Sequence, residues 1–386
     1  MSEQLTSKFY RPFNLEDERK QRHPLSRDPV AHQKKALDKL HVWFKNKHVP
    51  HAGGILVFPT GGGKTFAASH FLCDGPLSKG YKVLWLAHTH HLLEQAFFSF
   101  ETEVWHIPGT RPSLNVRVVS GTEGHFRVHQ IATTDDILIA TLQTMVNAQR
   151  RSHPQLEAWL KQASDKLFVV FDEAHHSPAS TYRKLIMELR QRHSEMYVLG
   201  LTATPDYMDE RKSGWLKELF PQEIIDQVSP EELMAVEILA KPIPEQHRTK
   251  FSTEFDAKKY HEWVGKNRDI PEEIITKLAE SEERNEFIAR TYLERRRQQQ
   301  PYGKTIIFTD RWFQCERLKG LLAKEGVRVD VMFSQTDINP GSVAARNKRI
   351  RDENAQVLER FRRNELDVLI NVKMLTEGTD VPDVQT

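Results

Sequence analysis

The chain contains very little cysteine and no long apolar run. Its 386 residues include two cysteines, Cys73 and Cys315, which lie far apart in the sequence. So sparse a set suggests neither a disulfide framework nor a metal site. No run approaches the roughly 18 apolar residues that a membrane-spanning helix requires, and the polar start of the chain lacks the apolar centre of a signal peptide. We therefore expect a cytoplasmic protein with no membrane partner.

The chain also has almost no net charge. Its 55 basic and 53 acidic residues leave a formal charge of +2. Overall charge therefore gives no support for binding to nucleic acid, and any such binding would need a local basic groove. A length of 386 residues is enough for two domains, each with a hydrophobic core of its own.

A glycine-rich loop lies between an apolar run and a helix-like segment. Residues 55–58 read Ile-Leu-Val-Phe, which is typical of a strand covered on both faces, and three glycines at 61–63 precede Lys64 and Thr65. Glycines let the backbone wrap a phosphate closely, and the N-terminus of the next helix adds partial positive charge. Lysine can reach the β- and γ-phosphates, and threonine can bind Mg²⁺. The predicted phosphate-binding residues are Thr60, Gly61, Gly62, Gly63, Lys64 and Thr65.

One position departs from the phosphate-loop pattern GxxxxGK followed by Ser or Thr. Phe58 stands where that pattern has its first glycine. A glycine-rich turn between a strand and a helix also occurs without nucleotide chemistry. An acidic residue after a second apolar strand would favour the interpretation as a nucleotide site.

Apolar strands alternate with helical segments along the following part of the chain. The expected strands cover residues 82–87, 116–119, 137–140, 167–171 and 197–201. This alternation predicts an α/β fold with a parallel sheet covered on both faces. Ligands of such sheets bind at the carboxyl ends of the strands, so the residues that follow the strands are the candidates for chemistry.

Two acidic residues follow the strand at 167–171. Asp172 stands where a carboxylate would hold Mg²⁺ through its water shell, and Glu173 could orient and polarise the attacking water. The alternative is a pair of surface acids at a strand end. The predicted catalytic residues are Lys64, Asp172, Glu173 and His175, with Thr65 and Asp172 at the metal ion.

Histidines and hydroxyls stand near the same strand ends. The histidines within residues 88–91 and 175–176 have no partners at zinc spacing, which makes zinc the weaker interpretation of both groups. Thr202 and Thr204 follow the strand at 197–201 and could couple the state of the phosphate to neighbouring segments. A Thr-Pro sequence at a strand end is also ordinary turn chemistry.

A helical segment predicted from Pro29 to about Lys47 precedes the glycine-rich loop. Its Gln33 carries an amide that could recognise an adenine edge with one donor and one acceptor. A glutamine on an exposed helix does not by itself indicate a function. The prediction that Gln33 recognises adenine therefore depends on its position before the glycine-rich loop.

Four segments, PTGGGKT, ILIATLQT, FDEAHH and GLTATP, occur in this order. Together they resemble superfamily 2 helicases and translocases, most closely the DEAH-type branch typified by the restriction subunit of type III restriction enzymes. In that family PTGGGKT is motif I, VLWLAHTHHLLEQ resembles motif Ia, DEAH is motif II and TATP is motif III. The resemblance covers about residues 28–385. It implies two RecA-like lobes, ATP bound between them, and a nucleic acid strand across both. Val30 stands where the family often has arginine, which weakens the argument for adenine recognition.

A second alternation begins at Lys304 and contains no glycine-rich phosphate loop, as expected when two lobes share one ATP site. The segment KTIIFTDR resembles motif IV, and VLINVKMLTEGTDVPD resembles motif V. The resemblance implies that Gly378 and Asp380 face the nucleotide and that Thr376 contacts a nucleic acid phosphate. The predicted nucleic acid contacts are Thr89, His90, Thr141, Gln143, Arg311 and Thr376.

These patterns divide the chain into four parts. We expect a polar extension at 1–27, a first RecA-like lobe at 28–238, a linker with a charged helical segment at 239–303, and a second lobe at 304–386. The family continues after motif V with motif VI, whose arginines reach the γ-phosphate and contribute about 10³- to 10⁵-fold in rate. We therefore expect the second lobe to be incomplete at its C-terminus, and the chain to bind nucleotide better than it hydrolyses it.

The sequence thus predicts an ATP- and Mg²⁺-dependent nucleic acid translocase or helicase, acting on DNA in preference to RNA. Contacts to the sugar–phosphate backbone would make it largely blind to base sequence. Family analogy suggests restriction or phage defence, with protein subunits of a larger complex as partners. One alternative is an ATP-gated subunit that binds nucleic acid as a scaffold without productive turnover. Another is a P-loop ATPase that acts on protein alone.

Overall fold

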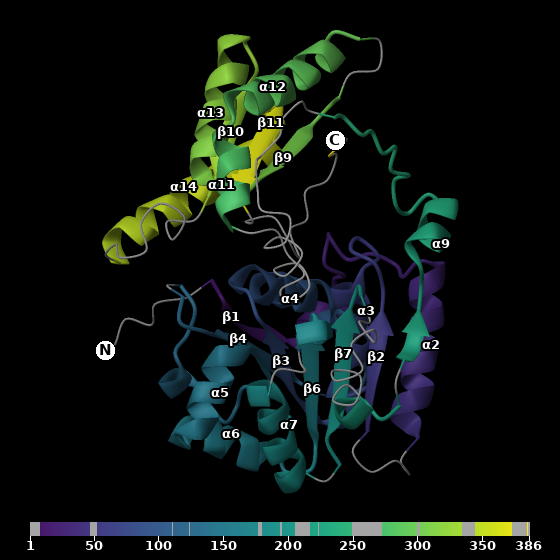
Figure 1. Ribbon diagram of the computed structural model, residues 1–386. Helices are drawn as coiled ribbons and strands as arrows, with labels where there is room; N and C mark the ends of the chain where they lie inside the picture. The colour runs from purple at the N-terminus through teal and green to yellow at the C-terminus, as the bar shows by residue number, and fades with distance from the viewer. Residues whose placement is uncertain are drawn as a thin grey trace. The chain divides into compact units, whose positions relative to one another are not determined.

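Two compact units, Met1–Pro242 and Ile243–Thr386, make up the chain in the computed structural model (Figure 1). Each unit is an α/β fold, as predicted, around a sheet that is mostly parallel in the first unit and parallel in the second. Within the described residues, no helix is both long and apolar enough to cross a membrane. The structure describes residues 8–46, 52–109, 111–122, 124–176, 180–193, 195–204, 217–222, 224–248, 272–298, 302–333, 344–372 and 384.

The first unit contains an 8-stranded sheet in the order β1-β4-β5-β3-β6-β7-β2-β8. Its strands are β1 (Tyr10–Asn14), β2 (Gly53–Val57), β3 (Lys82–Ala87), β4 (Ser113–Val119), β5 (Ile137–Thr141), β6 (Leu167–Asp172), β7 (Tyr197–Thr202) and β8 (Ile224–Gln227). Its α-helices are α1 (Leu15–Lys20), α2 (Ala31–Lys45), α3 (Lys64–Asp74), α4 (His90–Glu103), α5 (Leu142–Arg150), α6 (Pro154–Ala163), α7 (Ser180–Arg192) and α9 (Pro230–Ala235). Short 3-10 helices are η1 (Leu77–Lys79), η2 (Val104–His106), η3 (Val128–Gln130) and η4 (Ala174–His176).

Helices cover both faces of this sheet. Alternate residues of each strand belong to two separate cores, because successive side chains of a strand point to opposite faces. Leu56 and Phe58 pack with α2, α3 and α4, whereas Ile55 and Val57 belong to the core that includes α5, α6 and α7. Figure 1 shows α5, α6 and α7 in front of the sheet. Burial on both faces explains why the parallel strands read as continuous apolar runs.

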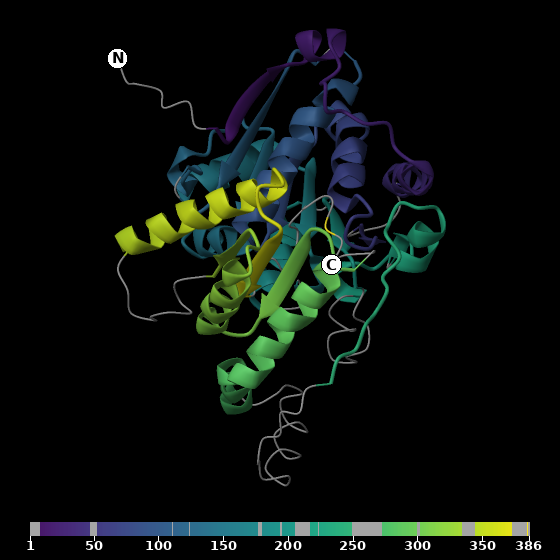
Figure 2. The ribbon, with the colours of Figure 1, turned by 90° about the horizontal axis from the view of Figure 1, so that it is seen from above.

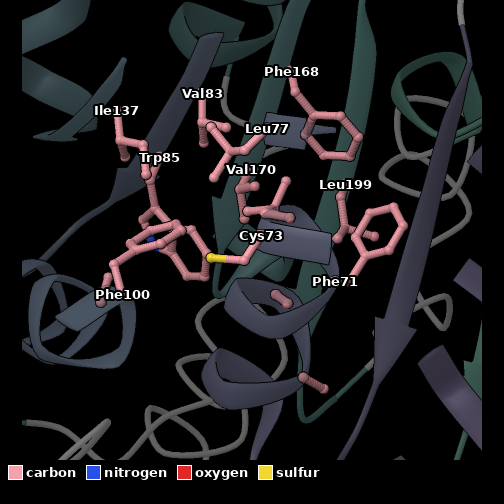
Figure 3. Packing of buried hydrophobic residues seen from close by; sticks show 14 of the residues in the cluster. Phe71, Cys73, Leu77, Val83, Trp85, Phe100, Ile137, Phe168, Val170 and Leu199 are labelled. Carbon is pink, nitrogen blue, oxygen red and sulfur yellow. The ribbon is translucent and has the colours of Figure 1, made fainter. Parts of the chain in front are cut away.

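The core on the α3 side is tightly filled around Cys73. Its side chain lies near Trp85 and Phe100, whose rings meet edge to face with centroids 5.7 Å apart (Figure 3). Burial raises the pKa of the Cys73 thiol well above its ordinary value. The side chains of Cys73 and Cys315 are both buried and are not joined in a disulfide.

The N-terminal segment is more structured than we expected from its charged sequence. Strand β1 pairs antiparallel with β4 at the edge of the sheet, with Tyr10 opposite Arg117. Phe13 and Leu15 are buried in the core. The guanidinium of Arg19 donates to the carbonyl oxygens of Ile107 and Arg111 at 2.9 Å. The polar extension predicted at 1–27 is therefore, where described, partly an integral edge of the first unit.

The second unit contains a 3-stranded parallel sheet in the order β10-β11-β9. Helices α12 and α13 pack on one face of this sheet and α14 on the other (Figure 2). Helix α12, which we expected within a linker segment, thus contributes to the core of this unit. The helices and strands of the second unit are α11 (Glu272–Glu280), α12 (Glu282–Arg296), β9 (Thr305–Thr309), α13 (Trp312–Lys324), β10 (Val329–Met332), α14 (Ala344–Arg362) and β11 (Val368–Val372).

Replacing Gly200 in β7 by alanine should destabilise the first unit. An added Cβ would lie 2.9 Å from the Cβ of Ala174 and 2.9 Å from Cζ of Phe220. Overpacking of this kind costs about 1–3 kcal/mol, which denaturant unfolding would measure. Gly320→Ala is the control, because nothing lies within 4 Å of its added Cβ and alanine favours the helix. An equal loss of stability in both variants would contradict this account.

Candidate nucleotide-binding site

The glycine-rich loop joins the end of β2 to the start of α3, as the sequence predicted. The N–H of Gly62 donates to the carbonyl oxygen of Pro59 at 2.9 Å, and Gly61 and Gly63 both have φ of +82°. This left-handed conformation favours glycine. A Cβ on Gly63 would also lie 2.4 Å from Nε2 of Gln33. The loop therefore depends on glycine for both its backbone conformation and its close packing.

The first residues of α3 lie directly after this loop. Lys64 is buried, with 7% of its surface exposed, and its Nζ donates to the carbonyl oxygen of Phe58 at 3.3 Å. The same amine lies 3.8 Å from Oε1 of Glu173. Thr65 is half-buried, whereas Thr60 and Gly61 are exposed at the surface of the loop. The N-terminus of α3 thus brings a buried positive charge to the exposed loop.

Asp172 and Glu173 follow β6 at the carboxyl edge of the sheet. Asp172 is 1% exposed and Glu173 6% exposed. Oδ1 of Asp172 accepts a hydrogen bond of 3.2 Å from the N–H of Glu173, whose φ of +54° is uncommon for a residue other than glycine. Such a conformation persists where the surrounding structure holds it in place. Here it turns the chain sharply after β6.

The carboxyl group of Asp172 has a strongly shifted pKa. Burial, followed by the neighbouring charge of Glu173, raises the pKa of Asp172 to about 7, although the charge of Lys64 acts in the opposite direction. Oδ2 of Asp172 is buried and makes no hydrogen bond to the residues that the structure describes. A buried carboxylate oxygen without a donor is well suited to a cation.

His175 connects these acids to the end of β7. Its Nδ1 lies 3.1 Å from Oγ1 of Thr202 and 3.4 Å from Oε2 of Glu173. Oγ1 of Thr202 donates to the carbonyl oxygen of Thr204 at 3.1 Å and accepts from the N–H of Thr204 at 3.2 Å. The residues predicted for catalysis and for coupling therefore form one continuous polar network.

Gln33 lies against the glycine-rich loop, close to the predicted phosphate site. Its Nε2 donates to the carbonyl oxygen of Gly62 at 3.2 Å, and its Oε1 accepts from the N–H of Val30 at 3.1 Å. His32, which sequence reasoning missed, is 2.9 Å from the same Gly62 oxygen through Nε2. A histidine next to the glutamine was visible in the sequence, but only the fold brings its ring to the loop.

The predicted nucleic acid contacts in the first unit lie at two helix N-termini. Thr89 caps α4 by accepting from the N–H of Leu92 at 3.4 Å, and Thr141 caps α5 by accepting from the N–H of Thr144 at 3.3 Å. These caps follow β3 and β5, at the carboxyl edge of the sheet. His90 and Gln143 are exposed in the first turns of the two helices.

The predicted contacts in the second unit are described only in part. Arg311 precedes α13, forms an ion pair with Glu272, and donates from Nε to Oγ1 of Thr276 at 3.4 Å. Its guanidinium is therefore engaged with α11. Thr376, Gly378 and Asp380 lie outside the described residues.

A basic hollow beside α5 was not predicted from the sequence. It has a volume of about 320 Å³ and extends from the residues that follow β4 along α5. Its basic residues come from two separate segments without any periodicity, which explains why the sequence did not reveal them. The lining residues are Ser120, Gly121, Arg127, Val128, His129, Thr144, Asn147, Ala148, Arg151 and His153.

Each of the two units contains a segment that matches the model of a known protein family. Residues 27–207 match the family model described as type III restriction enzyme, res subunit. Residues 283–386 match the helicase conserved C-terminal domain. A Saccharomyces cerevisiae protein named as an ATP-dependent helicase, IRC3, is 24% identical over 337 residues, which cover 84% of this chain and 42% of the relative. The chain thus spans less than half the length of that relative.

Solved structures with similar folds include helicases bound to nucleic acid. Saccharomyces cerevisiae Dbp5 bound to RNA and ADP BeF3 has a TM-score of 0.53 and 17% identity, with 92% of this chain and 73% of that chain covered. The helicase MrfA bound to DNA and AMPPNP has a TM-score of 0.54 and 14% identity, with 92% and 43% covered. At these identities the likeness shows the fold, two RecA-like lobes. The two family matches and the helicase relative, and not the fold alone, support a superfamily 2 helicase of the type III restriction enzyme res-subunit family.

Proposed function

We propose that the chain is an ATP-dependent nucleic acid helicase or translocase that acts on DNA. The observation that carries this proposal is the meeting of Lys64, Asp172 and Glu173 at one edge of the sheet, joined through His175 to Thr202. A site that only bound nucleotide would not need a buried acid beside the lysine together with a connection to the next strand.

Thr65 and Asp172 are the residues that would hold Mg²⁺ with the bound ATP. The donor set fits, because the buried Oδ2 of Asp172 has no hydrogen-bond donor among the described residues and Mg²⁺ prefers one or two carboxylates plus phosphate oxygens. When bound, the ion would neutralise charge on the β- and γ-phosphates. Lys64 would bind the same phosphates from the start of α3, where the helix N-terminus also favours negative charge.

Glu173 would orient the water that attacks the γ-phosphorus. Attack forms the new P–O bond while the bond to the bridging β–γ oxygen breaks, so the products are ADP and phosphate. Because His175 lies near both Glu173 and Thr202, a change at the γ-phosphate would alter the polar network at the end of β7. That network would carry the state of the nucleotide toward the segment after Thr204.

Gln33 would recognise adenine, because its amide already lies at the edge of the glycine-rich loop. To read the base, the amide would exchange its present bonds with Val30 and Gly62 for a donor and an acceptor on adenine. Gly378 and Asp380 are proposed to complete the nucleotide site.

The nucleic acid backbone would cross the carboxyl edge of the first sheet. The N-termini of α4 and α5 lie there and offer partial positive charge to phosphates. The basic hollow beside α5 would add Arg127 and Arg151. In the second unit, Arg311 and Thr376 are proposed contacts. Contacts of this kind position a strand without reading its bases.

DNA is the proposed substrate because the family match is to a restriction subunit. The fold itself does not discriminate, since its structural neighbours include a helicase bound to RNA and another bound to DNA. By the same analogy we propose a role in restriction or phage defence, in the cytoplasm, with further protein subunits. The competing function is an ATP-gated scaffold that binds nucleic acid without productive turnover.

Glu173→Gln should lower ATP turnover by about 10²- to 10⁴-fold, because the amide cannot polarise the attacking water, while ATP binding is retained. Lys64→Ala should weaken ATP binding itself, since the lysine neutralises phosphate charge. The measurements are steady-state ATP hydrolysis with single-stranded and double-stranded DNA and RNA, and binding of a fluorescent ATP analogue. Glu316→Gln, an exposed acid on α13, is the control. Normal turnover in Glu173→Gln would refute the assigned role, and undetectable wild-type turnover would favour the scaffold.

Thr202→Val should uncouple hydrolysis from work on DNA. Valine retains the shape of threonine but removes the hydroxyl that contacts His175 and Thr204. We expect ATP binding close to wild type and a larger loss in strand displacement or translocation than in ATP hydrolysis. Thr202→Ser, which keeps the hydroxyl, should restore coupling. Equal losses in valine and serine variants would indicate a packing role for this residue.

Arg127→Ala and Arg151→Ala should each weaken binding of single-stranded DNA and reduce its dependence on salt. Each lost phosphate contact should lower the slope of log affinity against log salt by about 0.7. Fluorescence anisotropy over a salt series would measure this slope. Arg192→Ala is the matched control, because that arginine pairs with Glu157 of α6 and does not line the hollow. An unchanged slope in both test variants would remove the hollow from the proposed path.

A further inference from the structure

Two histidines and a glutamate meet in a cluster away from the nucleotide site. His70 lies on α3, Glu103 is the last residue of α4, and His106 ends η2. Nδ1 of His70 is 2.8 Å from Oε2 of Glu103, and Nε2 of His106 is 3.5 Å from the same oxygen. One ligand atom from each residue therefore lies within 4.8 Å of the other two.

The glutamate in this cluster is fully buried, with 0% of its surface exposed. Its Oε1 makes no hydrogen bond to the described residues, and neither does Nε2 of His106. In the part of the chain that the structure describes, no lysine or arginine is ion-paired with Glu103; its partners are the two imidazoles. A buried carboxylate needs a nearby cation, because transfer of an isolated charge from water to the interior is costly.

The charged groups around the cluster are already paired with one another. Asp74 lies 3.1 Å from Nε2 of His41. Arg22 stacks over Trp105 and pairs with Asp28 at 3.1 Å. The ring of Trp105 lies 3.6 Å, centroid to centroid, from the ring of His106. No neighbouring side chain among these supplies the positive charge that Glu103 lacks.

Both imidazoles are held in place by their surroundings. The ring centroids of His70 and His106 are 4.1 Å apart, and Phe66 lies 5.7 Å from His70. Oγ of Ser69, the residue before His70, is 2.6 Å from Oγ of Ser99, and this hydrogen bond joins α3 to α4. The three ligand side chains thus project from elements that already pack together.

We propose that His70, Glu103 and His106 bind one Zn²⁺ ion, with water as the fourth ligand. Two nitrogens and a carboxylate oxygen are a common ligand set for zinc. Atoms bound at about 2.0–2.1 Å in a tetrahedron lie about 3.3 Å apart, and the observed separations of 2.8 and 3.5 Å bracket that value. The ion would be bound through Oε2 of Glu103, would give Nε2 of His106 the partner that it lacks, and would compensate the buried charge.

This ion would act as a cross-link between the helix that carries the phosphate-binding lysine and the helix that Thr89 caps. Residues Lys64–Asp74 form the first, and His90–Glu103 the second. The site is separate from the magnesium proposed at the nucleotide, and its existence does not depend on hydrolysis. The sequence carries a signal for it in the i, i+3 spacing of Glu103 and His106, but His70 is brought there only by the fold.

The first test is zinc binding by the purified full chain after treatment with a chelator, followed by equilibrium dialysis against zinc alone and metal analysis. We expect one Zn²⁺ per chain. Co²⁺ should replace it and give the strong visible absorption of a four-coordinate site. X-ray absorption should show nitrogen and oxygen ligands at about 2.0–2.1 Å and no sulfur.

His106→Asn and Glu103→Gln should each weaken zinc binding by more than about 100-fold, because loss of a direct ligand should exceed the 10- to 100-fold cost of losing an outer partner. His41→Asn is the matched control, since His41 lies beside the cluster but pairs with Asp74. Binding of an ATP analogue would report whether each variant is folded. Zinc should raise the melting temperature of wild type and His41→Asn, and not that of His106→Asn.

Three results would overturn the proposal. Unchanged stoichiometry and affinity in His106→Asn and Glu103→Gln would mean an adventitious ion only. Absence of zinc and cobalt binding by the wild-type chain would mean that His70 and Glu103 form a buried ion pair without metal. Sulfur in the X-ray absorption spectrum would place the metal elsewhere in the chain, and this result does not depend on how any variant folds.

Discussion

The burial of one lysine with two carboxylates is the interaction on which the organisation of the first lobe depends. Lys64 lies 3.8 Å from Glu173, and Asp172 is adjacent. Charges removed from water are costly unless they are paired and hydrogen-bonded. Two acids share one base here, and burial, followed by the charge of Glu173, raises the pKa of Asp172. The site is therefore better matched to a metal-bound polyphosphate than to any neutral ligand.

The order of the strands explains how these charges come together. Strand β7 lies between β6, which carries the acids, and β2, which leads into the glycine-rich loop. Parallel pairing aligns the carboxyl ends of all three strands at one edge. Any residue at the end of β7 must then lie next to both the acids and the loop, and Thr202 occupies that position. A hydroxyl there can respond to either neighbour.

Much of this arrangement was predictable from sequence because it depends on local patterns. The apolar runs indicated the strands, and the residues that follow them indicated Lys64, Asp172 and Glu173. The link from His175 to Thr202 was predicted only as coupling near the phosphate, because hydrogen bonds between adjacent strands require the sheet order. The proposed roles of Thr376, Gly378 and Asp380 stay predictions.

Other features could not be predicted because they depend on distant segments. Strand β1 contains Arg11 and Pro12, which hide its alternation of apolar and polar residues. The basic hollow combines a loop after β4 with the far end of α5. Helix α12 looked like a charged linker because only one narrow stripe of its surface is buried, with Ala289 and Tyr292 in the core. In each case the burial pattern depends on a partner that the local sequence does not specify.

The antiparallel pairing of β1 with β4 has a consequence for the lobe as a whole. Without it, β4 would be the last strand of a large parallel sheet, with a row of unpaired N–H and C=O groups available to any other extended chain. Strand β1 covers that row. Its own outer edge contains Pro12, which has no N–H to offer. Residues 10–14 therefore protect the edge of the sheet from pairing with another chain. A shortened protein that begins after Asn14 would lose solubility before it lost its nucleotide site.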